Sequence, residues 1–203
     1  MISTFCVILL AAIATKGIDF STAISVSTLQ CLSKDGYTFA IPRGYCSYGA
    51  IDPNVNSNIE HAKSAGFAHV DAYIFPCVSC GNAAGQIDSF VSSVHGYGMA
   101  WYDVEVYKWS SNQETNRNFI TAAINQLKAK GVKPGIYTSL NSWGTIVGKS
   151  WAGVSSCPLW YPHYDNNPSF SDFSAYGGWT KPAIKQYAGD KTVCGAGVDL
   201  NFY

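Results

Sequence analysis

Short apolar segments alternate with segments of helical periodicity along most of the chain. The apolar segments that we predict to be strands cover residues 17–20, 37–45, 68–75, 97–105 and 132–138. The segments in which apolar residues recur at helical spacing cover residues 26–33, 54–65, 82–95, 113–130 and 139–147. Repeated strand–helix units of this kind predict a parallel sheet with helices packed on its outer face.

The last part of the chain follows a different pattern. Three more strands are predicted at residues 158–164, 183–187 and 196–201, with no clear helix between them. Eight strands favour a closed barrel, so we expect an α/β fold of the modified TIM-like type, roughly (β/α)5(β)3, with the late helices missing. An open doubly wound sheet is the alternative. The turn after the first strand has no glycine-rich phosphate loop, so we expect no dinucleotide cofactor.

The composition narrows the class of protein. The chain has 203 residues, enough for one domain with a sizeable core, and 47% of them are hydrophobic while only 13% are charged. Thirteen Lys and Arg residues balance thirteen Asp and Glu residues. Without basic runs, this balance argues against a nucleic-acid partner. Aromatic residues make up 14% of the chain, which suits a sugar-binding cleft as well as ordinary core packing.

The first residues have the features of a secretory signal peptide. Residues 5–13 form an apolar run, and Ala12 and Ala14 resemble the small residues of a cleavage site. The run is shorter than the roughly 20 residues that a membrane-spanning helix needs. We therefore expect a signal peptide at 1–14, one domain at 15–203, export from the cytosol and no membrane span. A buried N-terminal strand or helix is the alternative.

The cysteines agree with an oxidising compartment. Cys6 lies in the expected signal peptide, and an even number remains for disulfides, with fifteen possible pairings. These six are Cys31, Cys46, Cys77, Cys80, Cys157 and Cys194. The spacing of Cys77 and Cys80 matches a redox motif, but Pro76 precedes it and Gly81 follows it, which favours a loop disulfide over a thioredoxin-like site. A zinc site has even less support, because no second cysteine or histidine pair accompanies this motif.

Four acidic residues fall where predicted strands end. Asp19 ends the first strand, Asp103 and Glu105 end the fourth, and Asp199 ends the eighth. In a parallel barrel these ends form the mouth where active sites lie, and the first and eighth strands become neighbours when the barrel closes. Asp103 and Glu105 are two positions apart, so their side chains share a face, with Cα atoms about 6.5–7 Å apart. We expect all four carboxyl groups to meet at one mouth.

Such a group of acids has a chemical use. Four carboxylates without matching cations repel one another, and the repulsion raises at least one pKa, so that one carboxyl group keeps its proton near neutral pH. A protonated acid beside ionised ones is what cleavage of a glycosidic bond requires. A helix cap at Asp19 and a calcium site are the alternatives, but no spaced Asp/Asn/Gly loop supports calcium.

With these acids identified, the chain resembles the glycoside hydrolase family 25 lysozymes, and in particular their nematode and protist branch. The matching stretches cover nearly all of residues 15–203. They are GIDFST, FAIPRGY, HVDAYIFPCVSCGNAAGQID, WYDVE, GIYTS, PLWYPHYDNNPSFSDF, GGWTKPAIKQY and CGAGVDLNFY.

The resemblance implies an eight-stranded barrel that cleaves the β-1,4 bond between N-acetylmuramic acid and N-acetylglucosamine in bacterial peptidoglycan. It implies that Glu105 is the proton donor and then the base, and that Asp103 stabilises developing charge or orients the substrate's acetamide group. Asp19 and Asp199 are implied to set the local field and to hold substrate or water. No metal and no organic cofactor is implied.

Further residues near the predicted strand ends are candidate substrate contacts, although core packing or a structural hydrogen bond explains each of them equally well. They are Tyr73, Tyr137, Trp160, His163, Tyr164 and Gln186. We expect a secreted, monomeric muramidase that acts in defence or digestion, outside the cell or in the lumen of digestive vesicles. A catalytically inactive peptidoglycan-binding protein on the same barrel is the alternative.

Overall fold

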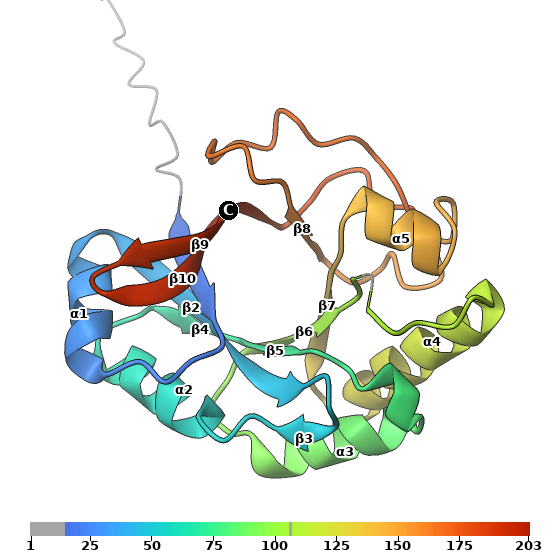
Figure 1. Cartoon of the computed structure of the whole chain (residues 1–203), viewed down its shortest axis with the longest axis horizontal. Coiled ribbons are helices and arrows are strands. Elements are labelled where there is room, and N and C mark those ends of the chain that lie inside the picture. The colour runs from blue at the N-terminus through green and yellow to red at the C-terminus, as the bar shows by residue number, and fades with distance from the viewer. Residues whose placement is uncertain (1–14, 106) are drawn as a thin grey trace, which may run out of the picture.

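The computed structural model describes residues 15–105 and 107–203, in which eight strands form a closed ring (Figure 1). β1 pairs with both β2 and β10 and so closes the barrel, β4 and β5 both pair with β2, and β3 pairs with the last residues of β2. The strands are β1 (Lys16–Phe20), β2 (Tyr37–Cys46), β3 (Ala50–Ile51), β4 (His69–Val70), β5 (Ala72–Ile74), β6 (Met99–Asp103), β7 (Lys133–Tyr137), β8 (Leu159–Pro162), β9 (Ile184–Val193) and β10 (Ala196–Phe202).

Five α-helices lie outside the ring, while the β8 side is covered only by irregular loops (Figure 1). The helices are α1 (Val26–Lys34), α2 (Val55–Ser64), α3 (Ala83–Ser93), α4 (Gln113–Ala129) and α5 (Leu140–Ile146), with a short 3-10 turn, η1 (Val78–Cys80). Each of the first five barrel strands is followed by a helix and the last three are not. The predicted (β/α)5(β)3 barrel is therefore confirmed, and the open doubly wound sheet is excluded.

The direction of the last strand differs from the prediction. β9 runs parallel to β8, but β10 runs antiparallel to both β9 and β1. The pairing of Val193 with Ala196 leaves Cys194 and Gly195 as a two-residue turn, with φ angles of 53° and 79°. A two-residue connection can join only antiparallel strands, because a parallel return needs a crossover of a dozen or more residues. An all-parallel barrel is therefore wrong for β10.

The period-2 alternation of the strands divides the buried residues into two layers. One side of each strand packs against the helices, in a large core that includes Ile18, Ala100 and Ile136. The other side points into the barrel. There a second cluster consists of Phe39, Ile41, Trp101, Tyr137, Trp160 and Ile184. Large aromatic side chains thus fill the barrel interior, and they form the floor on which a site at the mouth can be built.

Two glycines make room for these rings. A Cβ atom at Gly17 would lie 2.3 Å from the ring of Phe39, and one at Gly135 would lie 2.3 Å from the indole of Trp101. Neither distance is compatible with a side chain at the glycine. The glycines of GIDF and GIYT therefore face aromatic residues that pack directly on the backbone of β1 and β7.

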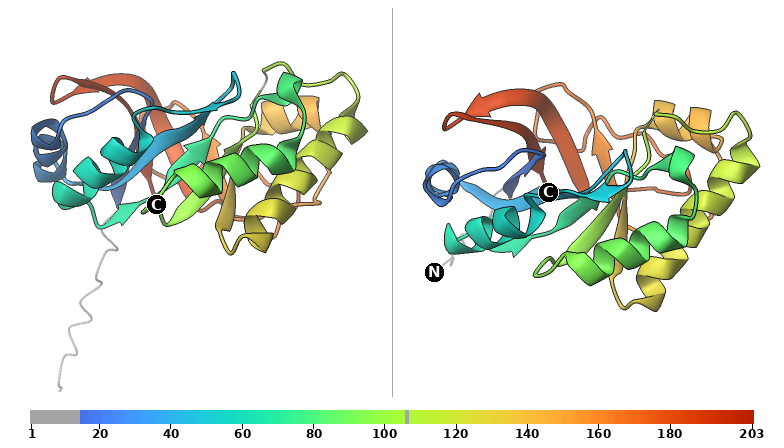
Figure 2. Two further views of the ribbon diagram at one scale, coloured as in Figure 1. Left: turned by 90° about the horizontal axis from the view of Figure 1, so that it is seen from below. Right: turned by 60° about the horizontal axis from the view of Figure 1, so that its bottom comes forward.

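The expectation that all six cysteines pair is wrong in part. Cys31 of α1 bonds to Cys194 in the β9–β10 turn, and Cys77 bonds to Cys80. Both views in Figure 2 place the β9–β10 hairpin next to α1. Cys46 and Cys157 remain as buried thiols, and Cys46 Sγ donates to Asp52 Oδ2 at 3.7 Å.

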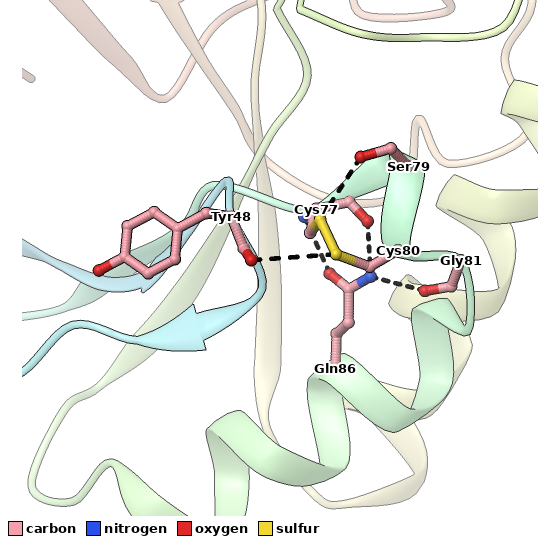
Figure 3. Close-up of a disulfide and its surroundings, with 6 residues drawn as sticks. All are labelled: Tyr48, Cys77, Ser79, Cys80, Gly81 and Gln86. Atoms are coloured by element: carbon pink, nitrogen blue, oxygen red, sulfur yellow. Dashed lines mark hydrogen bonds between the residues drawn. A yellow bond between two sulfur atoms is a disulfide. The ribbon is translucent and has the colours of Figure 1, made fainter.

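The disulfide between Cys77 and Cys80 spans a turn rather than a helix start (Figure 3). Gln86 of α3 holds this turn, because its Nε2 donates to the carbonyl oxygens of Cys77 and Gly81 at 2.8 and 2.7 Å. The backbone N–H of Cys77 donates in return to Gln86 Oε1 at 3.0 Å. Cys77 precedes only the three-residue 3-10 turn η1, and α3 begins at Ala83, so neither sulfur lies at the N-terminus of an α-helix and the loop disulfide is confirmed.

The expected signal peptide, residues 1–14, lies outside the described residues. Among the helices of residues 15–105 and 107–203, none combines the length and the apolarity that a membrane crossing demands.

Replacing both Cys31 and Cys194 with serine is expected to lower the free energy of unfolding by about 5 kcal/mol, because this bond joins residues separated by 163 positions. The matched replacement of Cys77 and Cys80, separated by three positions, is expected to cost only about 2 kcal/mol. Urea unfolding monitored by tryptophan fluorescence measures both. Equal losses in the two double variants would contradict the prediction.

Candidate active site

Every barrel strand contributes one side chain to a single cavity at the mouth of the barrel. The cavity has a volume of about 210 Å³. The strand residues are Asp19, Arg43, Tyr73, Asp103, Tyr137, Trp160, Gln186 and Asp199, and loops add Phe75, Glu105 and Tyr164. All four acids predicted from the sequence therefore line one cavity, as do five of the six predicted contact residues.

Strand alternation explains why the acids converge. Asp103 lies two positions beyond Trp101, whose indole fills the barrel interior, so the Asp103 side chain points the same way at the next level. Asp19 and Asp199 are direct partners in the β1–β10 ladder. Asp199 lies in the middle of β10 and not at its end, so the predicted location is wrong. It still reaches the mouth because the antiparallel β10 enters the barrel from that side.

Asp19 is held by two neutral amide donors. Its Oδ2 accepts hydrogen bonds from Asn201 Nδ2 at 2.6 Å and from Gln186 Nε2 at 2.9 Å. Burial raises the pKa of Asp19 from 3.8 to about 7, the charge of Asp199 adds to the increase, and the two amide donors oppose it. Asp19 therefore titrates near neutral pH.

Asp103 is buried and has fewer partners. Its Oδ1 has no hydrogen-bond partner among the described residues. Burial raises the pKa of Asp103 well above the ordinary value, and the charges of Glu105 and Asp19 raise it further. An unpartnered carboxyl oxygen inside a cavity is costly unless a ligand group satisfies it.

Glu105 and Asp199 are less enclosed. Burial raises the pKa of Glu105, followed by the charge of Asp199. Burial also raises the pKa of Asp199, although the backbone N–H of Asp190 donates to Asp199 Oδ1 at 2.7 Å and favours its ionised form. The pKa values of all four acids are thus raised, which favours their protonated forms.

The cause of these shifts differs from the sequence-based expectation. Mutual repulsion was expected to dominate, but burial contributes most to each of the four raised pKa values. Repulsion by another of these acids comes second for Asp19, Asp103 and Glu105 only. One cation, Arg43, lines the same cavity, but it forms its ion pair with Asp52 and not with any of the four acids.

Gln186 connects the acids to the aromatic wall. Its Nε2 donates to Asp19 and, at 3.2 Å, to Asp199 Oδ2. Its Oε1 accepts from the hydroxyl groups of Tyr137 at 2.7 Å and Tyr164 at 2.9 Å. One amide therefore fixes two acids and two tyrosines, and Gln186 is a structural centre of the site rather than a peripheral contact.

His163 is the one predicted contact residue that does not line the cavity. β8 ends at Pro162, and the His163 ring lies outside the barrel with Nδ1 at 2.6 Å from Asp172 Oδ2. The fully buried Lys185 completes this outer cluster, because its Nζ donates to Asp165 and Asp172 at 2.7 Å each. These contacts hold the loop that carries Tyr164, so His163 supports this loop from outside the cavity.

Three residues of the site were not predicted. Arg43 and Phe75 line the cavity, and Asn201 supports Asp19 while accepting a hydrogen bond from Trp160 Nε1 at 2.8 Å. Arg43 could have been predicted from the sequence, because it lies two positions beyond the apolar Ile41 and therefore on the same face of the second strand.

Two groups of metal-binding residue types converge among the described residues, and both lie away from the cavity. In the first, Cys31 and Cys194 are bonded to each other beside Asp35. The second contains His163, Asp165 and Asp172, where the ammonium of Lys185 already supplies the positive charge. The cavity acids do not form such a group, so the calcium interpretation gains no support.

Comparisons with known proteins agree with this geometry. A family model described as lysozyme-like protein 1 matches residues 11–187. "Probable GH family 25 lysozyme 2" of Dictyostelium discoideum is 42% identical over all of this chain and 97% of its own length. "Lysozyme-like protein 5" of Caenorhabditis elegans is 38% identical over 98% of this chain and 94% of its own length.

Solved structures share the fold at lower identity. A family GH25 lysozyme from Aspergillus fumigatus superposes with a TM-score of 0.78 at 20% identity, covering 94% of both chains. A bacterial lysozyme from Streptomyces coelicolor superposes with a TM-score of 0.79 at 23% identity, covering 94% of this chain and 92% of its own.

The raised pKa of Asp19 makes a prediction about stability. Between the unfolded value of 3.8 and the folded value of about 7, the folded state binds more protons, so stability falls as pH rises through this range. Asp19→Asn removes this titration and is expected to raise the Tm at pH 7 by about 3 °C or more, with little change at pH 4. Differential scanning calorimetry at both values measures the effect.

The surface residue Asp88 provides the matched control. The hydrogen bond from Lys130 holds the pKa of Asp88 below its usual value, so Asp88→Asn is not expected to stabilise the protein at pH 7. A lower Tm for Asp19→Asn than for the wild type at pH 7 would contradict the linkage.

Proposed function

This chain belongs to the glycoside hydrolase family 25 lysozymes, and from this premise we propose that it hydrolyses the β-1,4 bond between N-acetylmuramic acid and N-acetylglucosamine in bacterial peptidoglycan. The observation that carries the proposal is the cavity in which Asp19, Asp103, Glu105 and Asp199 meet with raised pKa values. Oxocarbenium-like transition states need a proton donor and nearby negative charge, and this cavity supplies both.

Glu105 is the proton donor in this proposal. It follows β6 at the rim, where it is less buried than Asp103 and can approach a glycosidic oxygen. Its raised pKa keeps a larger fraction protonated near neutral pH than an exposed glutamate would have. After the leaving group departs, the ionised Glu105 takes a proton from the attacking water.

Asp103 and the Asp19–Asp199 pair act on the substrate's charge and orientation. The unpartnered Oδ1 of Asp103 is suited to accept the N–H of an acetamide group, which would orient that group toward the anomeric carbon. Asp19 and Asp199 are held by Gln186 and contribute negative potential beside the developing positive charge.

The aromatic residues of the cavity lie either beneath the acids, in the barrel interior, or beside them at the rim. Trp160 and Tyr137 are buried in the barrel interior and support the acids from below. Tyr164 is 56% exposed while its hydroxyl is held by Gln186, so its ring is available for stacking on a sugar. Tyr73 lines the cavity between these levels.

The catalytically inactive alternative is not favoured. The two relatives described above are named as a lysozyme and a lysozyme-like protein. The cavity also keeps four acids with raised pKa values that a purely binding surface would not require.

Secretion is the second part of the proposal. The apolar residues 5–13 and the two disulfides both fit export to an oxidising compartment, where a muramidase would meet bacteria in defence or digestion. N-terminal sequencing of protein recovered from culture medium tests this part. A first residue of Thr15 supports it, whereas protein retained in cells with Met1 intact opposes it.

Glu105→Gln is expected to lower kcat for peptidoglycan about 100-fold to 10,000-fold, because the amide is nearly isosteric and cannot supply a proton. Turbidity clearing of bacterial walls and release of reducing ends measure the loss. Glu114→Gln, on the exposed start of α4, is the matched control and should keep wild-type activity.

The products identify the bond that is cleaved. Mass spectrometry of the digest should find N-acetylmuramic acid at the new reducing ends. N-acetylglucosamine at these ends, or a wild-type protein that binds walls and releases no reducing ends, would overturn the proposed muramidase activity.

A further inference from the structure

Arg43 is a cation placed among four acids, and the proposed chemistry does not use it. Among the described residues that line the cavity it is the only one with a positive charge, and its side chain is 28% exposed. It sits on β2, two positions beyond Ile41 of the barrel floor, next to Tyr73 in the β2–β5 ladder. Its guanidinium therefore lies at the rim and not in the floor.

The guanidinium of Arg43 is held in place by acceptors that do not belong to the cavity. Its Nε donates to Asp52 Oδ2 at 2.8 Å, and Asp52 is only 2% exposed. Asp52 is itself fixed, because its Oδ1 accepts the backbone N–H of Asn54 at 2.9 Å. Nη2 has a longer contact of 3.4 Å with the carbonyl oxygen of Ser21. This support orients the planar group before any ligand arrives.

The charge of Arg43 is not used to neutralise the acids of the cavity. Within residues 15–105 and 107–203, its only ion pair is with Asp52. An arginine has five N–H donors, and Nη1 has no acceptor in the same part of the chain. The Nη1 donors and the positive charge of Arg43 are therefore available to a molecule that binds at the rim of the cavity.

An acid-lined cavity repels anionic substrates, and the substrate of the proposed reaction is anionic. The muramyl unit differs from N-acetylglucosamine by a lactyl ether that ends in a carboxylate, or in a stem peptide that carries carboxylates. We propose that Arg43 is a specificity-determining residue that binds such a carboxylate, and that it thereby selects muramyl glycans over uncharged chitin-type glycans. This inference rests on the proposed function of the same cavity.

Binding to a catalytically disabled protein tests the proposal without requiring turnover. In the Glu105→Gln background, calorimetry compares three ligands: peptide-stripped glycan with free lactyl carboxylates, glycan with intact stem peptides, and a chito-oligosaccharide. The double variant Arg43→Gln with Asp52→Asn removes the charge without leaving Asp52 buried and unpaired. It is expected to raise the Kd for a carboxylate-bearing ligand about tenfold to hundredfold, and to leave the Kd for the chito-oligosaccharide unchanged.

The three ligands separate the sources of the carboxylate. A loss confined to stripped glycan identifies the lactyl carboxylate, and a loss confined to peptide-bearing glycan identifies the stem peptide. Arg43→Lys keeps the charge without the planar fork and should recover part of the affinity. Lys130→Met, which removes a cation from the exposed pair with Asp88, is the charge-matched control and should change no Kd.

Two results would overturn the assignment. One is unchanged affinity for both carboxylate-bearing glycans in the Arg43 variants, and the other is an equal loss for all three ligands, since that would mean a general defect of the cavity. Circular dichroism of each variant confirms that it is folded. Failure of the proposed function appears separately, as absence of reducing ends from the wild-type protein.

Discussion

The site depends on burying carboxyl groups that would be more stable in water. A barrel interior filled by Trp101, Trp160 and Tyr137 leaves little room for solvent beneath Asp19 and Asp103, so their charged forms lose hydration. Two neutral amides, from Gln186 and Asn201, partly compensate this cost by donating to Asp19. Neutral donors hold an acid in place without lowering its pKa as strongly as an adjacent cation would. The protein therefore keeps protons available where an ion-paired acid would have lost them.

The strand alternation links this electrostatic environment to the fold. In three strands an apolar interior position is followed, toward the mouth, by a polar or charged one, in the pairs Ile41–Arg43, Trp101–Asp103 and Ile184–Gln186. The outward-facing residues between them pack on helices or, as with Lys185, bind a loop. A one-residue shift of any strand would exchange these two sets, so the same period that builds the core also places the chemistry.

Much of this could be predicted from the sequence, because strand ends in a barrel share one edge. Asp19, Asp103 and Glu105 followed from that rule. Asp199 was correctly predicted to lie at the mouth, but as the end of a parallel strand, which is wrong. The two-residue turn at Cys194 and Gly195 makes β10 antiparallel, and the apolar pattern does not reveal this turn. His163 does not line the cavity because it lies on the same outer face of the chain as Tyr161, and both side chains bond to Asp172. Disulfide pairing could not be predicted either, since the buried Cys46 and Cys157 have the same sequence signal as the bonded cysteines.

The pairing of β1 with β10 is the contact that closes the barrel. Asn201 donates to Asp19 across 182 positions of sequence, and the backbones of Thr15 and Tyr203 pair with each other at the edge of the ring. β1 can pair with β2 early, but its second neighbour, β10, lies at the other end of the described residues, and contacts of this separation form slowly. A nascent or prematurely terminated chain holds Glu105 but neither Asp199 nor the closed ring. The closed ring and the full set of cavity acids therefore depend on the same strand, β10.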